Sequence, residues 1–344
     1  MNFRVYFGIM YLLIPAVFYA LPVLMFENNG AVRLHFFQTF DVPANDLLKI
    51  GMGHVAVGSL LFYSVRNIHL IQGRLYRSNA AISLTIIVLF FAQLYTPLSY
   101  LRALMAAAFI YFVGNYSLTR YTMIPMVIIA LLKLFYDYDR YPLIVVVLLY
   151  SLPLFARKKL LSQILFIILG LVSMIFVLQP LRAGLMPFSG GFGSLIYLFH
   201  HLNPIYIAAF LCMNEDFGLS QLLGETVPLG KTIFGLTTVI DIIGIKYLPK
   251  NIFELGIRHG SNVSMYFGSW IGIVILSFVM FILNRMLILI KDRSVLNAIM
   301  VLLILNAPYF IRRTLGALFI DICILIIVSI FIQTFLKLVA KARV

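Results

Sequence analysis

The sequence predicts an all-α, polytopic integral membrane protein, and three observations lead to this prediction. Hydrophobic residues make up 62% of the 344 residues and charged residues 11%, whereas a soluble domain is typically about 45–50% apolar and about 25% charged. The mean hydropathy is +1.03. The apolar residues form continuous runs, as in 84–94, 141–155 and 322–332, a pattern that is typical of membrane-spanning helices and not of the alternating strands of a membrane β-barrel.

Ten runs approach the length of about 20 residues that a bilayer requires of a helix. In chain order, the predicted spans are 5–26, 45–65, 80–99, 103–119, 121–137, 141–156, 160–180, 264–290, 294–311 and 314–336. Those between residues 100 and 156 are short and are separated by tight turns at 96–102 and 137–142. No A-x-A-like cleavage site follows the first run, so we expect it to be a retained span and not a signal peptide.

One long polar segment interrupts the runs and divides the chain into three parts. Residues 1–180 are predicted to form an N-terminal bundle of about seven spans, 181–263 a large extracytoplasmic loop, and 264–344 a C-terminal bundle of about three spans. Two apolar stretches inside the loop, 194–212 and 232–245, are expected to be short interfacial helices. If both cross the membrane instead, the chain has twelve spans and the other orientations are unchanged.

The distribution of Lys and Arg predicts the orientation of the chain. These residues gather in the connections that are inside if the N-terminus is inside, for example at Arg66, Arg74, Arg77 and 157–159. The positive-inside rule therefore favours both termini in the cytoplasm and the long loop outside, which in a bacterium is the periplasmic face of the inner (cytoplasmic) membrane. The same bias accounts for the net charge of +14 without a nucleic-acid partner.

Arginines outside the cytoplasmic connections form the first group of candidate site residues. A guanidinium offers a rigid fork of donors that matches phosphate oxygens, and lipid headgroups and lipid-linked pyrophosphates lie at this depth. We therefore expect part of this group to bind a substrate phosphate, and the rest to anchor span ends by reaching the headgroups. The group consists of Arg102, Arg182, Arg258, Arg312 and Arg313.

A second group of polar residues lies just before the eighth predicted span. Glu254 and Arg258 are four residues apart and share a face if this segment is helical. His259 follows directly, and histidine is the usual side chain for proton transfer near neutral pH. The alternative is an ordinary capped helix start with an exposed Glu–Arg pair.

A third group consists of ionisable residues inside predicted spans, where such residues are costly and often functional. Lys49 and Lys133 lie near span ends, whereas Asp321 lies deeper and needs a partner such as His54 or one of these lysines. A structural buried pair is the simpler interpretation. The two cysteines, Cys212 and Cys323, have no metal-ligand spacing and predict no disulfide, so we expect neither a metal nor a cofactor.

The layout resembles that of the Wzy-type O-antigen polymerases and the related O-antigen ligases. In these families a large periplasmic loop late in the chain ends in a polar, often His-bearing segment, and a helix follows that begins with aromatic residues and a pair of glycines. Here that segment runs from 254 to 276, with His259, Tyr266, Gly268 and Gly272. Arg182 is similar to the arginines at the start of the family's loop.

The resemblance implies a GT-C-like fold and a metal-independent glycosyltransferase that polymerises oligosaccharide repeat units for O-antigen, capsule or exopolysaccharide. Donor and acceptor are both linked to undecaprenyl pyrophosphate, so the partners are these lipids, the surrounding membrane lipid and, in addition, a chain-length regulator protein. Arg182, Arg258 and Arg312, with Arg102 and Arg313, would hold the pyrophosphate. His259 would act as the base, and Glu254 as an alternative base or as the group that orients Arg258.

Three other functions fit the same layout. A transporter or flippase for lipid-linked sugars would place cationic residues in a central cavity, although the sequence shows no internal repeat. A polytopic acyltransferase would favour an essential His–Asp pair, and His54 is the one intramembrane histidine that hints at it. A structural partner in an envelope complex would need no chemistry of its own.

Overall fold

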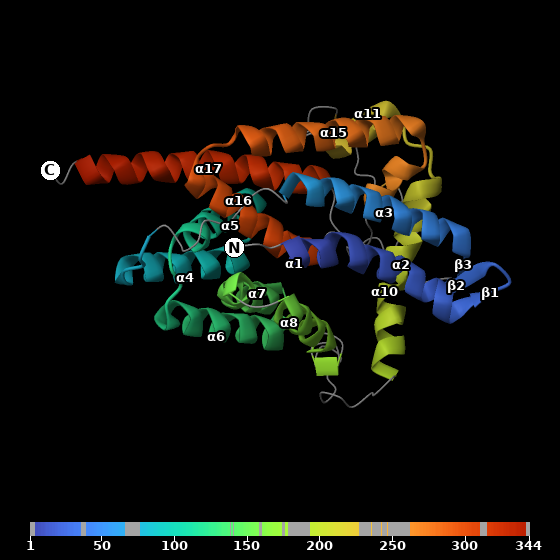
Figure 1. The fold of residues 1–344 in the computed structure, drawn as a ribbon, viewed down its shortest axis with the longest axis horizontal. Helices are drawn as coiled ribbons and strands as arrows, with labels where there is room; N and C mark the ends of the chain where they lie inside the picture. The colour runs from blue at the N-terminus through green and yellow to red at the C-terminus, as the bar shows by residue number, and fades with distance from the viewer. Residues whose placement is uncertain are drawn as a thin grey trace.

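The chain is mostly helical in a computed structural model, and helices cover the apolar runs of the sequence (Figure 1). The structure describes residues 4–35, 39–65, 76–137, 139, 141–157, 160–173, 176–177, 193–226, 235, 242, 246, 262–309 and 315–341.

The first span is a single rod of three helical segments, α1 (Arg4–Gly8), the π-helical turn η1 (Ile9–Leu13) and α2 (Ile14–Phe26). Pro15 explains the π turn, because proline has no N–H to donate to the carbonyl of Tyr11 four residues earlier and its ring crowds that carbonyl. The carbonyl of Tyr11 instead lies against Gly58 of α3 (Ala44–Val65). A Cβ atom at Gly58 would come within 1.9 Å of that oxygen, so the two helices approach closely only because residue 58 is a glycine.

A small antiparallel sheet, which the sequence analysis did not predict, joins this rod to α3. Its strands are β1 (Glu27–Asn28), β2 (Ala31–His35) and β3 (Thr39–Pro43), in the order β1-β2-β3. Asn29 and Gly30 form the turn of the first hairpin with φ values of 53° and 81°. A two-residue turn with both φ values positive is the type I′ geometry, for which Asn-Gly is the preferred pair. The prediction of an all-helical chain was therefore incomplete in this connection.

Most of the remaining helices follow the predicted runs with small shifts in their ends. Residues 219–226 form a helix that was not predicted, and the predicted stretch 232–245 lies mostly outside the described residues. The remaining helices are α4 (Ala80–Tyr95), α5 (Ser99–Asn115), α6 (Arg120–Asp137), α7 (Tyr141–Arg157), α8 (Leu160–Ser173), α10 (Gly193–Asn214), α11 (Leu219–Thr226), η3 (Asn262–Phe267), α15 (Trp270–Leu289), α16 (Arg293–Asn306), η4 (Ala307–Tyr309) and α17 (Leu315–Lys341). Helix α5, at the fourth predicted span, begins and ends four residues earlier than predicted. The reason is that Pro97 ends α4 at Tyr95, and α5 starts directly after the turn.

Four helical segments of the described chain are long and apolar enough to cross a membrane: Arg4–Phe26, Ala44–Val65, Trp270–Leu289 and Ala317–Val339. Large apolar side chains such as Phe278, Phe281 and Phe331 are more than half exposed on these helices. An aqueous solvent would penalise such exposure, whereas lipid tails accept it. These features are consistent with a helical membrane protein.

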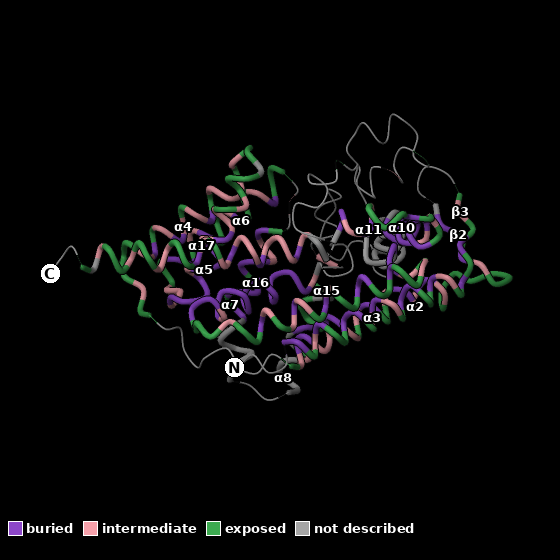
Figure 2. The backbone as a smooth tube through the Cα atoms, turned by 90° about the horizontal axis from the view of Figure 1, so that it is seen from above, coloured by how far each residue is buried: buried purple, intermediate pink, exposed green. Residues whose placement is uncertain are grey.

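Helix α16 forms the centre of the molecule, and nearly all its residues are buried (Figure 2). It packs against α5, α7 and α17, so the segments before and after the long loop share one core. Helix α3 packs against the first rod and α15. Helix α10 runs across the direction of α2, α3 and α15, near the end that carries the sheet (Figure 1).

Candidate functional site

Several helix ends and one helix interior line a partly open cavity of about 390 Å³ with polar and apolar walls, and Arg102 belongs to this lining. The walls come from α4, α5, α16, α17 and the connection from α6 to α7. The polar residues among them are Gln93, Arg102, Asp139, Tyr141, Asn306 and Asp321. A concave site with a few convergent polar groups in otherwise apolar walls is the usual form of a small-molecule site.

Small residues of α5 create the space. Ala103, Ala106 and Ala107 line the cavity together with Ile110, so they lie along one face of the helix at spacings of three and four residues. Leu302 of α16 and Leu325 of α17 form apolar walls. The cavity therefore combines a short-side-chain floor with polar groups that approach from several elements.

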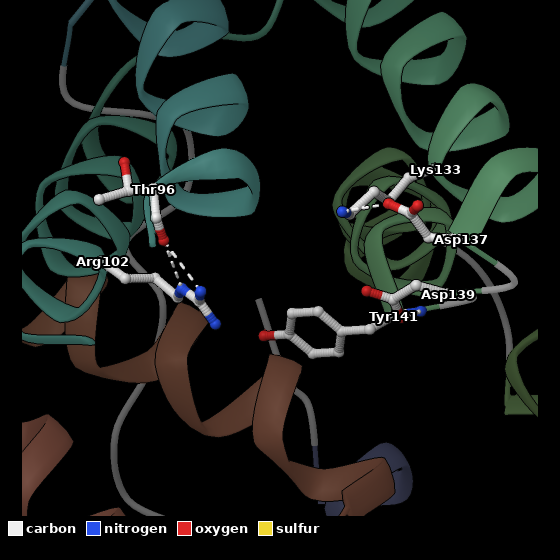
Figure 3. Close-up of polar contacts among 6 residues, drawn as sticks. All are labelled: Thr96, Arg102, Lys133, Asp137, Asp139 and Tyr141. Atoms are coloured by element: carbon white, nitrogen blue, oxygen red, sulfur yellow. Dashed lines mark hydrogen bonds and ion pairs between the residues drawn. The ribbon is translucent and has the colours of Figure 1, made fainter. Parts of the chain in front are cut away.

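The turn between α4 and α5 positions Arg102. Because Thr96 leaves the helical conformation before Pro97, its carbonyl is available, and Arg102 donates to it from Nε at 3.1 Å and from Nη2 at 2.9 Å (Figure 3). Nη1 makes no hydrogen bond with the described residues. The guanidinium and the Tyr141 hydroxyl point toward one another in Figure 3, so a donor edge with no partner among the described residues faces this wall of the cavity.

Asp139 and its neighbours belong to the connection from α6 to α7. The Asp139 carboxylate accepts a hydrogen bond from the Tyr141 backbone N–H at 3.0 Å, at the start of α7. Lys133 pairs with Asp137 one turn later on α6 (Figure 3). Its ammonium also lies 4.6 Å from the centre of the Tyr95 ring. These contacts serve the local fold, although Asp139 also lines the cavity.

Asp321 and Asn306 approach the cavity from the C-terminal helices. Asn306 is buried at the end of α16. Asp321 lies inside the candidate span Ala317–Val339, in the apolar stretch ALFIDICIL. An ionisable group at this depth is costly unless it faces a partner or a cavity, and the shared cavity supplies such a setting.

The residues of the third predicted group do not come together. Lys49 pairs with Asp46 at 3.1 Å, and Lys133 pairs with Asp137, each within its own helix. His54 is fully buried, bonds through Nδ1 to the Ile50 carbonyl at 2.9 Å and packs against the Tyr19 and Phe267 rings. Asp321 instead lines the cavity that contains Arg102.

Most predicted site residues lie outside the part of the chain that the structure describes. Arg102 is the one member of the predicted arginine and loop groups within it. The others are Arg182, Glu254, Arg258, His259, Arg312 and Arg313.

The described residues do show how the segment after His259 is held. Asn262 begins η3, and Tyr266 within it is buried. A Cβ atom at Gly268 would lie 2.3 Å from the carbonyl oxygen of Met213, near the end of α10. The aromatic residue and the glycine therefore dock the segment that follows His259 against α10.

Sequence reasoning missed most of the cavity. Gln93, Asn306, Asp139 and Tyr141 carry no motif, and each is ordinary in its own stretch of sequence. One signal was present: Arg102, Asp139 and Asn306 all lie near ends of runs that the predicted orientation places on the same side of the membrane. Grouping polar span-end residues by side would have brought these three together.

Within the described residues no group of three or more His, Cys, Asp or Glu side chains is arranged to hold a metal ion. A scan against protein-family models and searches of curated proteins and of solved structures find no match to this chain.

Proposed function

We propose that this protein is a membrane glycosyltransferase that polymerises oligosaccharide repeat units linked to undecaprenyl pyrophosphate. In this proposal it has ten spans in a GT-C-like arrangement in a bacterial inner membrane, with both termini in the cytoplasm. The reaction takes place on the periplasmic side, where the long loop and the cavity lie.

The observation that carries the proposal is the Arg102 cavity and the helix ends around it. The ends of α4, α6 and α16 and the start of α5 meet there, and the predicted orientation assigns all of them to the periplasmic side. The opposite ends also group together: Asn115 of α5 donates to the Ser294 carbonyl of α16, and Gln333 of α17 donates to Asp292. This consistent grouping supports the predicted alternation of spans.

The reaction needs a positively charged site for the leaving group and an acceptor for one proton. A hydroxyl of the acceptor unit attacks the anomeric carbon of the donor, a new C–O bond forms, and the bond from that carbon to the pyrophosphate oxygen breaks. The lipid pyrophosphate leaves with the electron pair, and the hydroxyl proton passes to a base. Arg182, Arg258, Arg312 and Arg313 are assigned to the leaving group, and His259 or Glu254 to the proton.

A deletion strain complemented with arginine variants tests this proposal. The deletion should abolish long polysaccharide and leave single lipid-linked repeat units, because initiation and export do not need the polymerase. Arg182→Ala and Arg258→Ala should fail to restore long polymer although the protein is inserted and abundant, and Arg102→Ala should shorten it. The measurements are the polysaccharide ladder on a gel and the amount of protein in the membrane.

Arg33→Ala provides a matched control. Arg33 forms an exposed ion pair with Asp41 on the hairpin at 3.0 Å, away from the cavity, and exposed pairs contribute little. This variant should restore the full ladder. A full ladder with Arg182→Ala or Arg258→Ala would reject the pyrophosphate role of these arginines.

A second candidate function is proton-coupled transport of the same lipid-linked saccharides, and the position of Asp321 in the cavity favours it. The side of the membrane on which the deletion strain accumulates its saccharide separates the two functions. Units that a lectin reaches from the outside of spheroplasts indicate a polymerase, and units that it reaches only after lysis indicate a transporter.

A further inference from the structure

We propose that α5, α16 and α17 bind an internal water molecule between the side chains of Asn115, Asn297 and Ser329. Each of these helices supplies one of the three residues. The ligand is a small neutral molecule that both donates and accepts hydrogen bonds, and its site is independent of the proposed function.

Three buried polar atoms without partners point to this site. Asn115 and Ser329 are fully buried, and Asn297 is 2% exposed. In the described part of the chain, Asn115 Oδ1, Asn297 Nδ2 and Ser329 Oγ have no hydrogen-bond partner. A buried polar atom without a partner is costly, and lipid around a span supplies none. Such atoms therefore indicate a bound polar molecule.

Contacts between α5 and α16 bring Asn115 and Asn297 to nearly the same level of the bundle. The Nδ2 atom of Asn115 donates to the Ser294 carbonyl at 3.0 Å, and Asn297 lies one turn after Ser294 on α16. A Cβ atom at Gly114, the residue before Asn115, would lie 3.2 Å from the Asn297 carbonyl oxygen. The two asparagines are therefore separated along the bundle by no more than one helical turn, about 5 Å.

Ser329 reaches the same level from α17. Gln333, one turn later on this helix, donates to Asp292 at 3.1 Å just before α16 begins. Leu325, one turn earlier, lines the cavity described above together with residues of α5 and α16. Ser329 shares the face of these two residues, because residues four apart on a helix are neighbours on its surface. It is therefore carried into the contact of α17 with the other two helices, near the second turn of α16, which contains Asn297.

The Ser329 hydroxyl does not use the backbone of its own helix. Ser and Thr side chains in helices often donate to the carbonyl four residues earlier, and Thr334 of the same helix donates in this way to Ile330 at 2.9 Å. Ser329 makes no such bond with any described residue. Its hydroxyl is therefore available to a molecule held between the helices.

The three atoms fit water better than an ion. Asn115 Oδ1 is an acceptor, because Nδ2 of the same amide already donates to two carbonyls. Asn297 Nδ2 is a donor, and the Ser329 hydroxyl can do either. A buried water typically makes about three hydrogen bonds to groups of this kind, and it fits either orientation of the Asn297 amide. A hard cation would need oxygen ligands alone.

Close packing beside the site limits the size of the ligand. A Cβ atom at Gly114 would lie 3.1 Å from Cα and 3.2 Å from N of Ala298, so the backbones of α5 and α16 approach closely there. A larger polar ligand would have to separate these helices, whereas a water molecule needs only about 30 Å³.

The sign of one stability change tests the proposal. If water bonds to the Ser329 hydroxyl, Ser329→Ala removes a hydrogen bond, and the folding equilibrium constant should fall by roughly two- to tenfold. If the hydroxyl has no ligand, the same change removes an unpaired buried group, and the constant should rise or stay the same. Unfolding of the full-length protein in mixed micelles with increasing SDS measures the constant. A rise or no change would overturn the proposal.

Ser151→Ala is the matched control. Ser151 is also fully buried in a helix, but its hydroxyl already donates to the Leu148 carbonyl at 2.8 Å. That carbonyl keeps its helical N–H partner when the hydroxyl is removed, so the constant should change by about twofold or less. An equal fall for both variants would mean that any buried hydroxyl has this effect, and would also overturn the proposal.

Solid-state NMR of the unaltered protein in lipid bilayers observes the ligand directly. With ¹⁵N-labelled asparagine, the buried side-chain amide of Asn297 should show a cross-peak at the water proton frequency. Asn297→Leu identifies this signal by removing it, and Asn297→Ser does so if the first variant is not recovered folded. Without a water cross-peak the proposal is wrong, whatever the stability of the variants. Greater stability in sodium chloride than in choline chloride would show a cation at the site instead, and would overturn it too.

Discussion

Asn115 shows how one polar side chain can join two helices inside an apolar bundle. It is fully buried, and its Nδ2 donates to the carbonyls of Tyr111 at 2.9 Å and of Ser294 at 3.0 Å. The second bond links the end of α5 to the start of α16. Asn115→Ala removes this donor and leaves the buried Ser294 carbonyl without it, so we expect the free energy of unfolding to fall by about 1–3 kcal/mol. Unfolding in mixed micelles with increasing SDS measures the change.

Asn214→Ala is the matched control for this prediction. The Asn214 amide also donates to the carbonyl four residues earlier, that of Phe210 at 2.9 Å, but it is exposed at the end of α10. Its removal should change the free energy of unfolding by about 0.5 kcal/mol or less. Equal losses for the two variants would show that Asn115 does not join the helices.

The partner of Asn115 illustrates what a sequence alone cannot supply at the residue scale. Ser294 lies 179 positions further along the chain, and no pattern around either residue indicates the other. The Arg102–Thr96 contact, six positions apart, is different: Pro97 predicts a turn and hence a carbonyl without a helical partner. Local contacts of this kind can be predicted, whereas contacts between distant helices need the packing.

At the scale of the elements, the contact of η1 with α3 depends on Pro15 and Gly58 together. Gly58→Ala places a Cβ atom within 1.9 Å of the Tyr11 carbonyl oxygen, a backbone atom that cannot turn away. We expect α3 and the first rod to separate slightly, with a loss of about 1–3 kcal/mol in the free energy of unfolding, as for other overpacked sites. The same SDS titration measures it.

Gly170→Ala in α8 makes the same chemical change in open space, since no described heavy atom beyond the neighbouring helix backbone lies within 4 Å of the new Cβ position. Alanine also favours a helix over glycine by up to about 1 kcal/mol. This variant should therefore be neutral or stabilising. A loss as large as that of Gly58→Ala would mean that helix propensity or lipid contact, and not the close approach to Tyr11, governs both positions.

The positions of most helices were predictable from the sequence, because each long, continuous apolar run predicts a helix over its own length. The sheet was missed although Asn29-Gly30 is a sequence pair that strongly favours a hairpin turn. A prediction from apolar runs assigns no secondary structure to the connection between the first two spans. The eighth predicted span is split, since the 3-10 turn η3 precedes a break at Gly268 and Ser269 before α15 begins. The Ser269 side chain caps α15 by accepting the Gly272 N–H at 3.1 Å, a local signal that the apolar run concealed.

At the scale of the whole molecule, the cavity could not be predicted, because its walls come from five parts of the chain between Gln93 and Leu325. Composition and run lengths fix which segments are helical and leave the choice of neighbours open. The packing of α16 between α5, α7 and α17 makes that choice. The residues assigned to the reaction from the sequence, Arg182, Arg258 and His259, stay predictions for the same reason: their roles depend on a relative position that sequence order does not supply.

The orientation of the whole chain gives the last prediction. In a background with Cys212 and Cys323 replaced, single cysteines at Asn28, Asp216 and Lys291 occupy exposed positions on the hairpin, just before α11 and just before α16. A membrane-impermeant maleimide added to intact spheroplasts should label Asn28→Cys and Asp216→Cys, and should label Lys291→Cys only after lysis, because the positive-inside bias places that connection in the cytoplasm.

Each result of this labelling bears on a separate part of the proposal. Labelling of all three sites after lysis is the control for accessibility. If Lys291→Cys reacts in intact spheroplasts while Asn28→Cys does not, the chain is inverted, and the Arg102 cavity and the long loop then face the cytosol. If only Asp216→Cys is protected, the segment before α11 has crossed the membrane, since α10 or another part of the loop then acts as an additional span. The polymerase proposal requires Asn28 outside, because its lipid-linked donor and acceptor meet on that side, and its ten-span arrangement also requires Asp216 outside.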